Sequence, residues 1–215
     1  MWILPEIVVQ RVLQVGINNL KANPIAFNEI FAMYTQPEMN ADYGQAYIDK
    51  IRKWFCETKI PVVQGFSVNR ERLPSFSITL GSESEDESKA AIGDHYGEQI
   101  EDSVGVGVMS VMVDVGIHGD KDSDYVLYLY YIMSYIFFKE KLIAERLGVQ
   151  LQTWSASDLK KEDKYQDSMV WSRWVRFKCT TENVWTRDPK SRKDVDVSVR
   201  FDRAGIDDVP DDDLV

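Results

Sequence analysis

The chain has 215 residues, of which 44% are hydrophobic and 28% charged, which is ordinary for a soluble globular protein with one sizeable domain. A net charge of −10 leaves no large basic field, which disfavours a nucleic-acid-binding function. The charge is uneven: residues 81–124 carry 12 acidic and 2 basic side chains, and residues 204–215 carry 5 acidic and none basic. Such runs are usually solvated loops, but they also repel polyanions or dock on basic partners.

The two cysteines, Cys56 and Cys179, lie far apart and in no metal-binding or disulfide-like spacing. We therefore expect reduced thiols in an intracellular protein, not a disulfide framework or a zinc site. The first residues lack the basic region and cleavage site of a signal peptide. The longest apolar run, residues 125–138, has 14 residues and is too short for a membrane span. The sequence predicts a soluble protein made in the cytoplasm.

Helices are predicted at the N-terminus. Residues 6–22 have an apolar stripe at helical spacing, and Asn23-Pro24 ends this helix because proline disfavours helical geometry in the residue before it. A short helix over 25–34 and a further helix over 44–58, with Tyr47, Ile51, Trp54 and Phe55 on one side, are expected to follow.

Strands are predicted next. Residues 60–63 enter the first strand, and residues 75–80 form a second, in which apolar side chains alternate with Ser and Thr. Residues 82–102 are expected to form a long acidic connection, of a length that is usually functional or disordered. The longest strand is predicted over 103–118, where the valine-rich face alternates with small and polar residues.

One long central helix is predicted between Ser123 or Asp124, as the N-cap, and Gly148, as the stop signal. Its first half, up to Phe138, is apolar or aromatic on every side, which is typical of an enclosed helix. One sheet covers only one face of a helix. The other face is therefore expected to need a second layer or a neighbouring subunit.

The remaining strands are expected over 149–154, 169–180 and 195–201, with a charged loop over 158–167 between the first two. Two or three N-terminal helices, a mainly antiparallel sheet and one long buried central helix define an α+β fold. The predicted organisation is a single domain over 1–203 and an acidic C-terminal tail over 204–215. The basic stretch over 187–193 is interpreted as a solvated hairpin.

Catalytic chemistry has few candidates. His118 lies at a strand end near Asp114, Asp120 and Asp122, which suggests a metal cluster, yet no recognised metal-binding motif is present and a turn before a helix explains the same residues. A metal-dependent hydrolase that uses His118 or His95 with these carboxylates stays as an alternative. A small-ligand module in the cleft between sheet and helices is another.

The carboxylates of one acidic stretch are candidates for acid–base chemistry: Glu83, Glu85, Asp86 and Glu87. Carboxylates in a polar loop are usually solvated, however, which disfavours this role. We predict no catalytic, cofactor-binding or metal-binding residue, and no enzyme. Aromatic residues make up 12% of the chain, including 6 Trp and 10 Tyr. They indicate either a well-packed core or a surface that is buried against another subunit, where Trp and Tyr are enriched.

The order of these parts resembles the head-to-tail connector proteins of tailed bacteriophages, in particular the neck, collar and tail-terminator type. The resemblance rests on the N-terminal helices, Ile-Pro-Val-Val at 60–63, Pro-Ser-Phe-Ser-Ile-Thr-Leu-Gly at 74–81 and Gly-Asp at 93–94. A long valine-rich strand, one helix and a final pair of strands complete it. The similarity covers most of residues 1–203.

The resemblance implies a structural virion protein, made in the host cytoplasm, whose copies form a ring of about six or twelve subunits. Its implied partners are other copies of itself and neighbouring neck, tail-tube or sheath proteins, with no membrane. Genomic DNA would pass through the ring without sequence-specific binding, past acidic surface that it does not adhere to. Another tail or baseplate assembly protein is the alternative within the same class.

Overall fold

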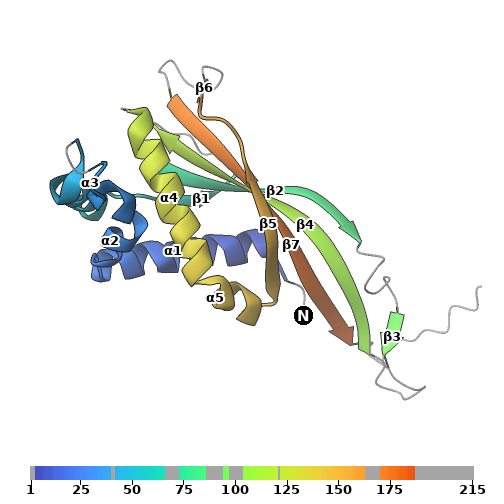
Figure 1. Ribbon diagram of the computed structural model, residues 1–215. Coiled ribbons are helices and arrows are strands. Elements are labelled where there is room, and N and C mark those ends of the chain that lie inside the picture. The colour runs from blue at the N-terminus through green and yellow to red at the C-terminus, as the bar shows by residue number, and fades with distance from the viewer. Residues whose placement is uncertain are drawn as a thin grey trace, which may run out of the picture.

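The computed structural model describes residues 3–39, 42–65, 73–85, 94–96, 104–120, 122–162 and 170–186. It shows helices packed against one face of a mixed β-sheet (Figure 1), which confirms the predicted α+β class. No helix among these residues is long and apolar enough to cross a membrane. The predicted strand over 195–201, the basic stretch over 187–193 and the acidic tail over 204–215 lie outside the described residues.

The N-terminal helices form where their apolar spacing predicts, except that the helix predicted over 25–34 divides into a short α-helix and a 3-10 helix. They are α1 (Pro5–Ala22), α2 (Ala26–Ile30), the 3-10 helix η1 (Ala32–Thr35) and α3 (Gly44–Glu57). Proline stands in the first turn of α1, where its missing N–H costs nothing. Gly16 of α1 lies against Ile136 so closely that an added Cβ atom would be 2.2 Å from a side-chain carbon. This glycine therefore sets how closely α1 packs on the central helix.

The sheet has the order β1-β2-β4-β7-β5, with β3 paired to β4 and β6 paired to β7. Its strands are β1 (Val62–Gln64), β2 (Ser75–Glu85), β3 (Asp94–Tyr96), β4 (Val104–Gly119), β5 (Val149–Ala156), β6 (Lys160–Glu162) and β7 (Val170–Thr186). The β1–β2 pair is parallel and every other pair is antiparallel. The prediction of a mainly antiparallel sheet is confirmed.

Two of the predicted loops are partly strand. β2 continues to Glu85 after an irregularity between Leu80 and Glu83, because its backbone pairs there with Val111 to Met109 of β4. β3 also lies within the predicted acidic connection of 82–102, and β6 lies within the predicted charged loop of 158–167. In each case, pairing with a longer neighbouring strand outweighs the low strand propensity of acidic and basic residues.

The central helix differs from its prediction at both ends. Its N-cap is Asp122, whose carboxylate accepts a hydrogen bond of 3.2 Å from the Asp124 backbone N–H, so neither Ser123 nor Asp124 is the cap. The helix breaks at Glu140 into α4 (Ser123–Lys139) and α5 (Lys141–Arg146). Gly148 ends the helical region with a φ of 83°, as expected of a C-terminal glycine.

One hydrophobic core fills the space between the helices and the sheet. The largest fully buried side chains come from both layers: Leu13, Phe27, Ile48 and Phe55 from the N-terminal helices, Phe76, Ile78, Ile117 and Phe177 from the strands, and Leu129, Ile132, Met133 and Ile136 from α4. Burial of each is worth about 1.5–3 kcal/mol relative to exposure. The all-round burial expected of α4 is not reached, because Tyr131 and Phe138 remain exposed.

The strands β4 and β7 extend past the helices. They pair from Gly119 and Trp171 at one end to Val104 and Thr186 at the other. Figure 1 shows that the half nearest β3 runs well beyond α1 and α5. We call the paired segments 104–110 and 180–186 the arm. The sheet therefore has a half that carries the core and a half that projects from it.

Candidate functional site: an apolar groove at the sheet edge

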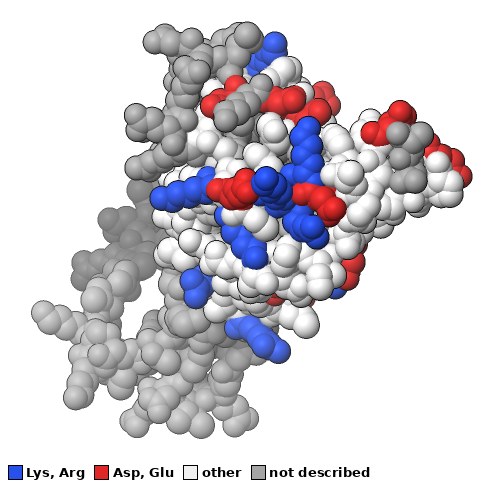
Figure 2. All heavy atoms as spheres, turned by 90° about the vertical axis from the view of Figure 1, so that its left-hand side faces the viewer, with Lys and Arg blue, Asp and Glu red and all other residues white. Residues whose placement is uncertain are grey.

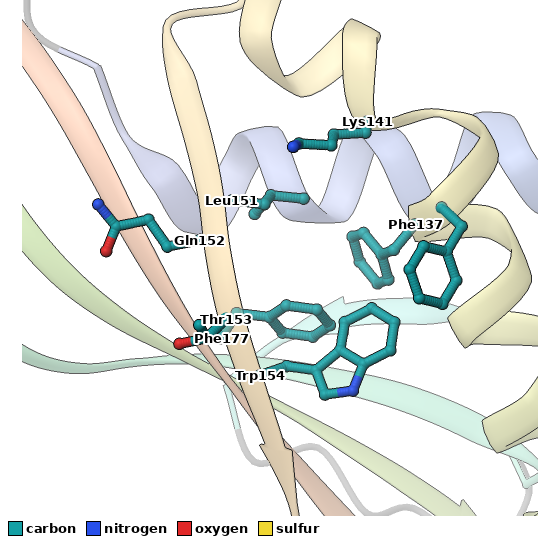
Figure 3. Close-up of a pocket in the computed structure, with 8 residues that line it drawn as sticks. Phe137, Lys141, Leu151, Gln152, Thr153, Trp154 and Phe177 are labelled. Atoms are coloured by element: carbon teal, nitrogen blue, oxygen red, sulfur yellow. The ribbon is translucent and has the colours of Figure 1, made fainter.

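A groove lies between the end of α4, the start of α5 and the edge strand β5 (Figure 3). Its volume is about 340 Å³. Its lining is mostly apolar and comprises Phe137, Phe138, Lys141, Leu151, Gln152, Thr153, Trp154 and Phe177. Lys141 is the one charged residue among them.

Aromatic rings form the base of the groove and one of its walls. The ring of Phe137 lies 4.5 Å from that of Phe177, and the Trp154 ring lies 5.5 Å from Phe177 and 5.0 Å from Phe138. Phe137 and Phe177 belong to the core and are 2% and 1% exposed, whereas Phe138 is 74% exposed. In Figure 3 the labelled rings of Phe137, Trp154 and Phe177 converge from the helix and the strands. The groove is thus an opening of the core at the molecular surface.

A bulge in β5 shapes the second wall. Leu151 pairs with Cys179 and Thr153 pairs with Lys178, so Gln152 is an extra residue in β5. Because of it, Leu151 and Trp154 face the same side of the sheet although they are three residues apart. The Gln152 side-chain amide donates a hydrogen bond of 2.5 Å to the Thr180 hydroxyl oxygen, which holds the bulge in place.

The groove borders an open sheet edge. In the part of the chain that the structure describes, β5 has β7 on one side and no strand on the other. Exposed edges of this kind can pair with another chain. Leu142 and Leu147, at 62% and 41% exposure, add apolar surface on and after α5. Contiguous exposed apolar surface next to a free edge is typical of an interaction site.

A second aromatic group lies between the N-terminal helices and α4, and its rings are buried or half-buried. They contact one another stacked, tilted or edge to face, at centroid distances of 5.2–6.3 Å, and belong to Phe27, Phe31, Tyr34, Tyr47, Phe55 and Tyr128. The Tyr47 and Tyr128 hydroxyls share a hydrogen bond. Burial, and then this hydrogen bond, raise the pKa of Tyr128 well above its ordinary value. Much of the aromatic content therefore serves the core.

The histidine and carboxylates predicted as a possible metal cluster are not gathered together. His118 is fully buried on the sheet face opposite the helices, and its two ring nitrogens lie 2.8 Å from the hydroxyls of Ser77 and Ser172. Asp114 is four residues away along β4, about 13 Å by strand geometry, and accepts two hydrogen bonds from Arg176. Asp122 caps α4.

Among the described residues, no group of three His, Cys, Asp or Glu side chains could hold a metal ion. The side chain of His95 lies outside the description, and Glu83 is exposed on β2. Cys179 is buried, which raises the pKa of its thiol to about 12 and keeps it protonated at neutral pH. Cys56 is exposed.

The face formed by the N-terminal helices carries both signs of charge. Figure 2 shows Lys and Arg side chains interleaved with Asp and Glu on this face. The pairs include Arg52 with Asp49 at 2.9 Å and Lys139 with Glu29 at 3.5 Å. Such a mixed surface does not provide the one-sided basic field of a nucleic-acid-binding face.

The comparisons with known proteins add no assignment. No protein-family model matches the chain, and a search of curated proteins finds no match. The groove residues were not predicted as a site from the sequence. The available signal was the step from the aromatic run ending at Phe138 to the charged run that starts at Lys139, which marks where an enclosed helix reaches the surface.

Proposed function

We propose that this protein is a structural virion protein of a tailed phage, whose copies form a ring at the neck that joins or closes the tail beneath the head. The layout of helices and strands that resembles the head-to-tail connector proteins supports the choice of family. The observation that carries an assembly role is the apolar groove beside the free edge of β5, with Phe138 74% exposed at its rim.

The sheet offers a second, different edge for a neighbour. β1 pairs only with residues 76–78 of β2, so among the described residues the outer side of β2 beyond Ile78 has no strand partner. The free edges of β5 and β2 lie at opposite sides of one sheet. Contact between two unlike surfaces is head-to-tail, and a repeated head-to-tail contact gives a ring when the rotation closes.

The charge of the chain suits a ring that DNA passes through. With a net charge of −10, the protein repels a polyanion on average, so DNA would slide past without sequence-specific binding. Another tail or baseplate protein would use the same surfaces, and the identity of its neighbours distinguishes the two. No observation favours the metal-dependent hydrolase, because His118 is occupied by two serine hydroxyls.

The first test is the mass of the purified protein by light scattering across a concentration series, with negative-stain images of the largest species. We expect closed rings of about six or twelve copies with a central hole. A protein that stays monomeric at high concentration, and that does not bind purified phage tails or heads in co-sedimentation, would contradict the proposal.

A matched pair of variants tests the surface. Phe138→Asp places a charge in the groove and is expected to raise the concentration for half-assembly about tenfold or more, since central aromatic residues dominate interface energies. Ile25→Asp is the control, because Ile25 is 69% exposed, lies before α2 and does not line the groove. Equal assembly of the two variants would show that the groove is not the interface.

A further inference from the structure

The side chains that line the groove favour one kind of occupant. Its surface is aromatic and aliphatic, and its single charged lining residue is the cation Lys141, which also lies 3.6 Å from Glu145. An occupant with apolar side chains and negative charge, and without basic residues, therefore complements it. Phe138 and Leu142 are 74% and 62% exposed, so none of the described residues covers this surface.

One segment of the chain has this composition. The acidic tail, residues 204–215, contains five aspartates and no basic residue. Its apolar residues are Ile206 before the aspartates, Val209 between them, and Leu214 and Val215 after them. Short segments that alternate acidic and apolar residues bind by placing the apolar side chains in a groove and the carboxylates near its cations.

The chain after β7 is long enough to reach a groove on another subunit. Phe177 at the base of the groove and Thr186 at the end of β7 are nine residues apart, which is about 30 Å along a strand. The strand runs away from its own groove toward the tip of the arm (Figure 1). Residues 187–215, at about 3.3 Å each, extend at most about 95 Å from that point, far enough to reach an adjacent copy.

We propose that the groove of each subunit holds the acidic tail, residues 204–215, of an adjacent copy. This inference rests on the proposed function, because it names the partner segment of the same surface. In this arrangement, Leu214 and Val215 contact the exposed ring of Phe138 and the half-buried ring of Trp154, and the aspartates lie near Lys141.

Disulfide trapping between full-length chains tests the contact. In a Cys56→Ser background, which leaves only the buried Cys179, one chain carries Leu142→Cys and a second carries Leu214→Cys. After mixing and mild oxidation, we expect a covalent heterodimer on a non-reducing gel. Ile25→Cys mixed with Leu214→Cys is the matched control, and its yield should be at least about tenfold lower.

A single chain that carries both Leu142→Cys and Leu214→Cys tests for cross-linking within a subunit. Three outcomes overturn the inference: equal cross-linking at position 25, no cross-linking between chains at position 142, or cross-linking only within the chain that carries both cysteines. Addition of Val215→Asp to the chain that carries Leu214→Cys should lower the heterodimer yield about tenfold, since a buried apolar contact is lost. Light scattering separates the two proposals. Rings without the 142–214 cross-link would remove the tail inference alone, and cross-linked dimers that never form larger species would remove the ring alone.

Discussion

The two aromatic groups of this protein are chemically alike and structurally opposite. Between the N-terminal helices and α4, the rings of Phe27, Phe55 and Tyr128 lie within the core, and the Tyr128 hydroxyl shares a hydrogen bond with that of Tyr47. At the sheet edge, Phe138 stands largely in solvent beside the half-buried Trp154. A count of aromatic residues therefore says little about interfaces. What distinguishes an interaction surface is a ring with one face packed and the other open.

The sharpest test of this difference is removal of a ring from the internal group. Phe55→Ala is expected to lower the free energy of unfolding by about 3–5 kcal/mol, because Phe55 is fully buried and packs 5.2 Å from the Phe27 ring, so its loss leaves a cavity. Urea denaturation followed by circular dichroism measures the change. A loss below about 1 kcal/mol would show that this group is not part of a rigid core.

The elements with strict periodicity could be predicted from the sequence. The helix α1 and the strand β4 follow from the helical spacing or alternation of valine, isoleucine and leucine, since a shift of one residue along a strand would turn its apolar side chains away from the core. The prediction for β7 ends at residue 180, whereas the strand continues to Thr186 through its pairing with β4. The long α4 follows from its apolar run. These are the elements in which local pattern and tertiary burial agree.

The structure differs from the predictions where contacts between distant parts of the chain determine the local conformation. No glycine or proline marks the break between α4 and α5 at Glu140. The N-cap of α4, Asp122, lies one residue before the predicted candidates. The groove combines residues of α4 with Trp154 of β5, and the bulge at Gln152 that aligns them depends on pairing with β7. No local signal in a single sequence specifies such a meeting of segments.

Removal of one hydroxyl from the buried group is expected to change stability by an intermediate amount. Tyr128→Phe is expected to cost about 1–2 kcal/mol at neutral pH, because it leaves the Tyr47 hydroxyl without this partner in a partly buried position. Phe is the matched replacement, since the ring and its contacts with Phe31 and Tyr47 are retained. Chemical denaturation of the two proteins in parallel measures the loss.

The same variant is expected to change how the free energy of unfolding depends on pH in the alkaline range. Burial raises the folded-state pKa of Tyr128 above its ordinary value of 10.0. Its contribution to stability is therefore complete below about pH 10 and declines as the pH rises further, because the unfolded chain releases the tyrosine proton first. Between about pH 9 and pH 11, the free energy of unfolding should fall less steeply in Tyr128→Phe than in the wild type. Parallel slopes would contradict the assignment.

The smallest expected effect on stability is at the aromatic group of the sheet edge, Phe138 and Trp154. Phe138→Ala should change the free energy of unfolding by less than about 0.5 kcal/mol in the monomer, because the side chain is 74% exposed and its loss creates no internal cavity. Its effect should appear instead in light scattering, as a higher concentration for assembly. A large loss of monomer stability with unchanged assembly would reverse the roles assigned to the two aromatic groups, since Phe138 would then support the fold through Trp154 and not contact a neighbour.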